Sequence, residues 1–122
     1  MLGIVVTTEK TMYKKDFGQP LYRAVEPVLA GYMEHVRPVY LPEPLCMLVN
    51  EEGILKKLPL NELASAWYNG IIVGNVIIMK DGYTEDGPDI LGLTEEECLK
   101  VIGIISATTM GDYRLVNMEE AK

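Results

Sequence analysis

The sequence is short of the residues that most often carry out catalysis. Its 122 residues include one histidine, two cysteines, one tryptophan and one phenylalanine. His35 has no nucleophile motif near it, and Cys46 and Cys98 lie too far apart for a CxxC pair. No GxxxxGK or GxGxxG phosphate-binding loop occurs. We therefore predict no catalytic residue and no enzymatic activity, and interpret both cysteines as buried free thiols.

The spacing of the potential ligands does not indicate a metal site either. One histidine and two distant cysteines cannot build a tetrahedral zinc site without help from a carboxylate. The acidic stretch 81–89 has the composition of a calcium loop, but Tyr83 and Asp86 stand where an EF-hand needs a ligand and a glycine. We therefore predict no metal and no cofactor, and interpret 81–92 as a solvated acidic loop.

Positive charge is scarce as well. Eleven Lys and Arg stand against 18 Asp and Glu, which gives a net charge of −7. Binding to a phosphate backbone needs clustered basic residues, so direct binding of nucleic acid is not expected. A charge of this size keeps a small domain in solution. The alternative is an acidic face that binds a basic surface of a protein partner, and Glu85, Asp86 and Asp89 are candidate contacts for it.

Long apolar runs are also missing. None approaches the ~20 residues of a membrane span. The N-terminal segment MLGIVVTTEK has no basic region of the kind that begins a signal peptide. We therefore expect a cytoplasmic protein without membrane contact. The length suits one domain, which we predict at 1–107, followed by a partly ordered C-terminal tail at 108–122.

What is present is a series of short strand patterns. The first two, at 2–7 and 12–17, form a hairpin. The third, at 33–41, is an edge strand because it contains Pro38. The last, at 71–80, is interrupted at Gly74-Asn75. In the third, His35 and Arg37 fall on one face. The fourth is a continuous apolar run, typical of a strand buried on both faces. These strands are expected at 2–7, 12–17, 33–41, 45–49 and 71–80.

Three helical patterns separate the strands. The first, at 20–31, is expected to break at Pro27. The second begins after Asn61 as N-cap and ends at Asn69-Gly70. The third begins at a capping box, Thr94 to Glu97, and presents one apolar stripe. Together these elements predict an α+β fold, with a mostly antiparallel sheet of four to six strands and two or three helices packed on it.

Several polar residues lie at the junctions between these elements. Asn50, Glu51, Asn61 and Asn75 are explained by a turn, a helix cap and a bulge, which is the favoured interpretation. The alternative is a small polar pocket beside Trp67 and Tyr68. Such a pocket could hold a small molecule such as a nucleotide.

The segments VNEEGILKKLPLN, IVGNVIIMK and GLTEEE resemble a family known only as a domain of unknown function. Its members are carried on phages, plasmids and conjugative elements of Firmicutes, and the resemblance covers roughly 31–105. Because that family has no established activity, it implies no catalytic residue. It does imply a mobile-element protein that acts by binding, as an anti-defence protein that inhibits a host nuclease such as a CRISPR effector, or as a regulator. The edge strand and the tail further suggest a homodimer.

Overall fold

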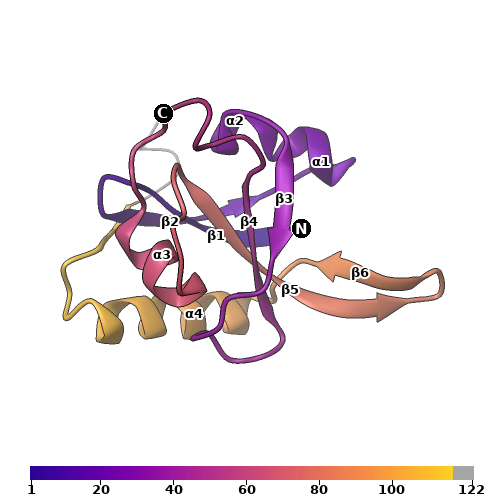
Figure 1. The fold of residues 1–122 in the computed structure, drawn as a ribbon. Helices are drawn as coiled ribbons and strands as arrows, with labels where there is room; N and C mark the ends of the chain where they lie inside the picture. The colour runs from indigo at the N-terminus through magenta and orange to yellow at the C-terminus, as the bar shows by residue number, and fades with distance from the viewer. Residues whose placement is uncertain (117–122) are drawn as a thin grey trace.

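The computed structural model describes residues 1–116, and its centre is a mostly antiparallel sheet (Figure 1). Within the described residues, the main path of the sheet runs β3-β4-β5-β1-β2-β7, and β6 pairs with β5. β7 joins β2 in parallel, whereas the other pairs are antiparallel. The strands are β1 (Leu2–Val6), β2 (Thr11–Asp16), β3 (Met33–Val36), β4 (Leu45–Asn50), β5 (Val76–Thr84), β6 (Gly87–Leu91) and β7 (Arg114–Leu115).

Helices cover both faces of this sheet. The single-turn helices α1 (Leu21–Ala24) and α2 (Glu26–Leu29) lie on one side, and α4 (Glu95–Thr108) crosses the other side (Figure 1). The short helix α3 (Glu62–Tyr68) packs on the same side as α4. Pro27 lies in the first turn of α2, where its missing N–H costs no hydrogen bond. The predicted break at this proline and the predicted α+β class are both confirmed.

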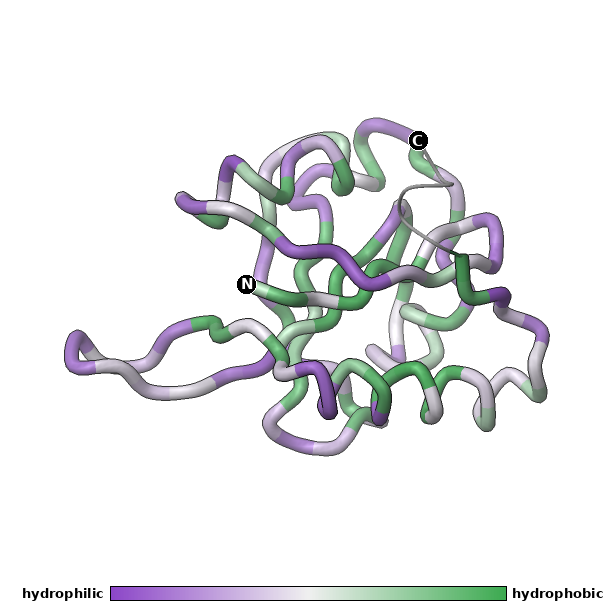
Figure 2. The backbone as a smooth tube through the Cα atoms, turned by 180° about the vertical axis from the view of Figure 1, so that it is seen from behind, coloured by the Kyte–Doolittle hydropathy of each residue, from purple (hydrophilic) through white to green (hydrophobic). Residues whose placement is uncertain are grey.

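The central strands divide their side chains between two cores. Because successive strand residues point to opposite faces, Val6 packs with α3 and α4 whereas Val5 packs against α1 and α2. The apolar run of β4 divides in the same way, with Met47 in the first core and Leu48 in the second. In Figure 2 the backbone trace through the centre of the domain is coloured mostly hydrophobic. The prediction that 45–49 is buried on both faces is therefore confirmed.

The stretch 81–92, which we predicted as an acidic loop, is instead half of a hairpin. β5 continues through Asp81 to Thr84, and β6 returns beside it and projects from the body of the domain (Figure 1). Gly82 allows this pairing because a Cβ atom there would collide with the side chain of Leu91. Composition alone suggested a loop, but strand formation depends strongly on the neighbouring strand.

The largest of the other differences from the predicted boundaries are at β3, β5 and the tail. β3 ends at Val36, before Pro38, although it does lie at the edge of the sheet as predicted. β5 starts only at Val76, because Gly74 takes a positive φ of 82° that turns the chain. In the predicted tail, α4 continues to Thr108 and Arg114–Leu115 forms β7, while 117–122 lie outside the described residues. Among residues 1–116, no helix has both the length and the apolar character needed to cross a bilayer.

Candidate functional site

Three neighbouring strands bring a histidine, a cysteine and an aspartate together. His35 is on β3, Cys46 on β4 and Asp81 on β5, and these strands are adjacent in the sheet. His35 stands opposite Leu48, and Cys46 stands opposite Met79. Cys46, Leu48 and Met79 all belong to the core under α1 and α2. Asp81 follows Met79 by two residues and His35 lies opposite Leu48, so both of their side chains point to that same face. The cluster is a polar continuation of that buried face.

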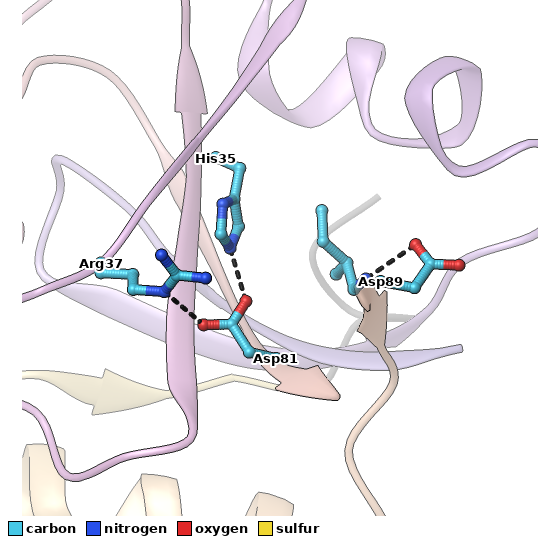
Figure 3. Close-up of polar contacts among 5 residues, drawn as sticks. His35, Arg37, Asp81 and Asp89 are labelled. Carbon is cyan, nitrogen blue, oxygen red and sulfur yellow. Dashed lines mark hydrogen bonds and ion pairs between the residues drawn. The ribbon is translucent and has the colours of Figure 1, made fainter. Parts of the chain in front are cut away.

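Asp81 is the centre of the cluster. Its Oδ1 lies 2.7 Å from His35 Nε2, and its Oδ2 accepts a hydrogen bond of 2.9 Å from Arg37 Nε (Figure 3). The ligand atoms of His35, Cys46 and Asp81 all lie within 4.8 Å of one another. One carboxylate thus joins a partly exposed imidazole and an exposed guanidinium, and a buried thiol lies close by.

The environment controls the charge of these groups. Burial raises the pKa of the Cys46 thiol to about 12, so at neutral pH the sulfur is protonated and is a poor nucleophile. Desolvation alone would raise the pKa of Asp81, but hydrogen bonds from Arg37 and His35 outweigh it and lower that pKa. The cluster therefore contains a carboxylate and a thiol, and it lacks the activated thiolate that a cysteine enzyme needs.

An open hollow of about 500 Å³ lies beside the cluster. His35, Arg37 and Asp81 form one part of its lining, and Tyr83 and Asp89 of the hairpin form another. Asp89 is thus one predicted contact residue that lies near the cluster, although its carboxylate accepts a hydrogen bond from the backbone of Ile90 (Figure 3).

The other two predicted acidic contacts, Glu85 and Asp86, are exposed in the turn between β5 and β6. They do not line the hollow beside Asp81. The structure therefore separates Asp89 from the acidic residues at the end of the hairpin.

A second, smaller hollow of about 130 Å³ lies between 49–55 and 71–73. The carboxylate-bearing residues Glu34, Glu51 and Glu52 line it and are exposed. Three aliphatic residues line it too and are strongly exposed, namely Ile54 (67%), Leu55 (82%) and Ile71 (68%). We call these six residues the acidic-rimmed surface.

A family profile described as a domain of unknown function, DUF3846, matches residues 1–104. The chain belongs to this family. The match confirms the resemblance found in the sequence and extends it to the first residue of the chain. No curated protein and no solved structure matches the chain.

In this DUF3846 domain, the two segments most typical of the family resemblance meet at the smaller hollow. VNEEGILKKLPLN supplies 49–55, and the strand segment IVGNVIIMK begins beside it at 72–73. Val73 of the second segment lies so close to Gly53 of the first that a Cβ on Gly53 would stand 2.7 Å from Val73 Cγ2.

The predicted asparagines divide between this hollow and the interior of the DUF3846 domain. Asn50 lines the smaller hollow together with Glu51, and its Nδ2 donates to the carbonyl oxygen of Leu29. Asn61 is completely buried, caps α3 and donates to two carbonyl oxygens. Asn75 accepts from the backbone of Thr8.

The two predicted aromatic walls do not meet these asparagines at a pocket. Trp67 is buried in the core under α3 and α4, and Tyr68 lines neither hollow. Of the residues predicted for this pocket, the structure thus brings Asn50 and Glu51 to one hollow but not the other asparagines or the aromatic walls, and Asn61 serves as a helix cap.

Sequence reasoning did not find the cluster around Asp81. The alternation in 33–41 correctly placed His35 and Arg37 on one face, and both do contact the same carboxylate. The composition of 81–92 predicts a loop for Asp81, whereas the pairing of β5 with β4 and β6 that positions it is a long-range feature. The period-two continuation from Met79 to Asp81 indicates which face of the strand Asp81 occupies, but it does not indicate the neighbouring strands.

Proposed function

We propose that this domain is a non-enzymatic protein of a mobile genetic element that binds a protein partner at the acidic-rimmed surface. The observation that carries the proposal is the exposure of Ile54, Leu55 and Ile71 around one hollow. Scattered exposed aliphatic residues are ordinary, but contiguous ones rimmed by polar groups are typical of a binding site. Burying them against a partner would remove apolar area from water at about 25 cal/mol per Å².

The size of the hollow favours a protein over a small molecule. Sites for drug-sized ligands and cofactors usually enclose about 300–1,000 Å³. The hollow at the acidic-rimmed surface has about 130 Å³, which suits one apolar side chain. The nucleotide alternative also loses support because the side-chain amide of Asn61 is fully engaged with backbone groups inside the domain.

Charge supports a partner with a basic surface. Glu34, Glu51 and Glu52 stand at the hollow, and among residues 1–116 no lysine or arginine lines it. The nearby Lys56 directs its ammonium group to the carbonyl oxygen of Ala30. Acidic rims speed association with basic partners and discourage acidic ones. Host nucleases present basic surfaces to DNA, so inhibition of such a nuclease, or regulation of another basic partner, is the role we propose.

The surface is held in place before any partner arrives. Asn50 donates to Leu29 and accepts from the backbone N–H of Glu52, both at 2.8 Å, which fixes the turn that carries Ile54. Gly53 and Val73, which both line the hollow, pack closely against each other. A surface that is ordered in advance loses less conformational entropy on binding.

The proposal can be tested by selecting a random peptide library on the immobilised domain. We expect a consensus with one large apolar residue flanked by Lys or Arg. Leu55→Ser with Ile71→Ser should weaken binding of the consensus peptide at least tenfold, since a lost anchor residue commonly costs more than about 1 kcal/mol. Leu99→Ser is the matched control, because Leu99 is 70% exposed on α4 and outside this surface.

Charge is tested separately with Glu51→Gln and Glu52→Gln against Glu85→Gln and Asp86→Asn. The first pair should slow association and reduce its salt dependence, whereas the second pair should not. Binding that depends on Glu85 and Asp86 instead would transfer the site to the hairpin turn and overturn the proposal.

The predicted homodimer is tested in the same material by light scattering. If Leu55→Ser converts a dimer to a monomer, the acidic-rimmed surface is an interface between two copies, and the partner proposal is wrong.

A further inference from the structure

We propose that His35, Cys46 and Asp81 bind one zinc ion and leave one coordination position open to the hollow beside the hairpin. The three residues supply an imidazole nitrogen, a sulfur and a carboxylate oxygen, which are the three protein ligand types of zinc. Sequence spacing gave no sign of this site, because each ligand comes from a different strand. One histidine and one cysteine are too few ligands for a zinc site, and Asp81 supplies the carboxylate as a third ligand.

The geometry is close to what a tetrahedral ion requires. With bonds of about 2.0–2.3 Å, the ligand atoms around zinc stand about 3.3–3.8 Å apart. Here the three ligand atoms lie within 4.8 Å of one another, and His35 Nε2 and Asp81 Oδ1 are 2.7 Å apart. Small side-chain rotations that open the His35–Asp81 contact and draw Cys46 Sγ inward would suffice. Binding of the ion would release the proton of the Cys46 thiol to solvent, and His35 would coordinate through an unprotonated Nε2.

Arg37 supports the proposed ligand set. It donates to Asp81 Oδ2 at 2.9 Å and so leaves Oδ1 directed at His35. Ligating carboxylates are commonly held by such an outer hydrogen bond, which fixes their orientation. The guanidinium is largely exposed, so water screens its charge from the ion.

The position of the three ligands points to an open site. Cys46 is buried, while His35 and Asp81 line the hollow of about 500 Å³. The described residues bring three ligands together here, so the fourth position would be filled by water or by a donor atom of a ligand in the hollow. This site lies apart from the acidic-rimmed surface and does not depend on the proposed function.

The experiment uses the reduced, chelator-treated protein, titrated with Zn²⁺ in competition with a chromophoric chelator and separately with Co²⁺. We expect one Zn²⁺ per chain, bound at about micromolar concentration or below. Bound Co²⁺ should show the near-ultraviolet charge-transfer absorption of a cobalt–thiolate bond. Lack of stoichiometric Zn²⁺ binding or of this absorption in the unaltered protein overturns the proposal without any variant.

Variants then identify the ligands. Cys46→Ala should abolish the charge-transfer absorption, whereas Cys98→Ala should retain it, because Cys98 lies on α4 on the opposite side of the sheet. Asp81→Asn and Arg37→Gln should weaken Zn²⁺ binding at least about tenfold, while Asp89→Asn should not. Circular dichroism checks that each variant is folded. Loss of binding in a Glu85→Gln, Asp86→Asn protein, or of the absorption in Cys98→Ala, contradicts the assignment.

Discussion

The carboxylate of Asp81 on β5 reaches across β4 to within 2.7 Å of the imidazole of His35 on the edge strand β3. The same carboxylate accepts a hydrogen bond from Arg37, just beyond the end of β3. The edge strand is therefore tied to the centre of the sheet by side chains as well as by its pairing with β4. This arrangement links the stability of the domain to the protonation of one aspartate.

We predict that Asp81 makes the domain sensitive to acid. Its pKa is lowered in the folded protein, so the folded state favours the carboxylate more than the unfolded state does. The stabilisation is complete above the unfolded pKa of about 4 and is lost as the pH falls through the lower folded value. Asp81→Asn should therefore reduce the free energy of unfolding at pH 7, and its difference from the unaltered protein should shrink from about pH 5 to about pH 2.

Urea unfolding at a series of pH values, with a chelator present, measures this effect. Asp89→Asn is the matched control, because Asp89 lines the same hollow but its carboxylate bonds only to the adjacent backbone of Ile90 among the described contacts. A difference between Asp81→Asn and the unaltered protein that stays constant over this pH range would contradict the prediction.

Asn61 should be the most sensitive of the junction asparagines. Its Oδ1 accepts from Ala64 N, and its Nδ2 donates to the carbonyl oxygens of Val6 and Gly74 at 3.1 and 3.0 Å. Asn61→Ala removes the cap of α3 and leaves two buried carbonyl groups without this donor, so we expect a loss of about 2–4 kcal/mol. Asn61→Asp keeps the cap acceptor but faces the same carbonyls with negative charge, and should cost at least as much.

Chemical denaturation of both variants gives these values. Asn75→Ala is the comparison, because Asn75 is only partly buried and its bonds of 3.2 and 3.5 Å are long. It should cost about 1 kcal/mol or less. Equal losses at Asn61 and Asn75 would show that burial of Asn61 is not the deciding factor.

The sequence was sufficient where local signals determine the structure. The capping box at Thr94, the N-cap at Asn61 and the break at Pro27 each depend on residues within a few positions, and all three are present. The hairpin at 81–91 and the cluster at Asp81 depend on which strands become neighbours. Gly82 and Asp89 are typical of loops in isolation, yet they pair with each other once β5 and β6 meet.

Glu97 joins the start of α4 to the sheet. Its Oε1 accepts from Lys80 Nζ at 2.7 Å and from Thr94 N at 2.8 Å, and these hydrogen bonds lower the pKa of this carboxyl group. We expect Glu97→Gln to keep most of the capping box and to lose the ion pair, at a cost of about 0.5–1 kcal/mol because both groups are partly exposed. A double-mutant cycle with Lys80→Met isolates that energy. A coupling indistinguishable from zero would contradict the prediction.

The two buried thiols should report different opening events. Cys46 lies in the central strand β4, so alkylation there requires loss of the sheet, whereas Cys98 lies in the first turn of α4 and needs only local fraying of that helix. We expect Cys98 to be labelled faster than Cys46 in the folded protein. Thr94→Ala removes the helix cap, worth about 1 kcal/mol, and should accelerate labelling of Cys98 about fivefold while leaving Cys46 much less affected. Mass spectrometry of single-cysteine variants, Cys46→Ala and Cys98→Ala, follows each rate. If Thr94→Ala accelerated both thiols equally, α4 would open only together with the whole sheet, and the capping box would contribute to global stability alone.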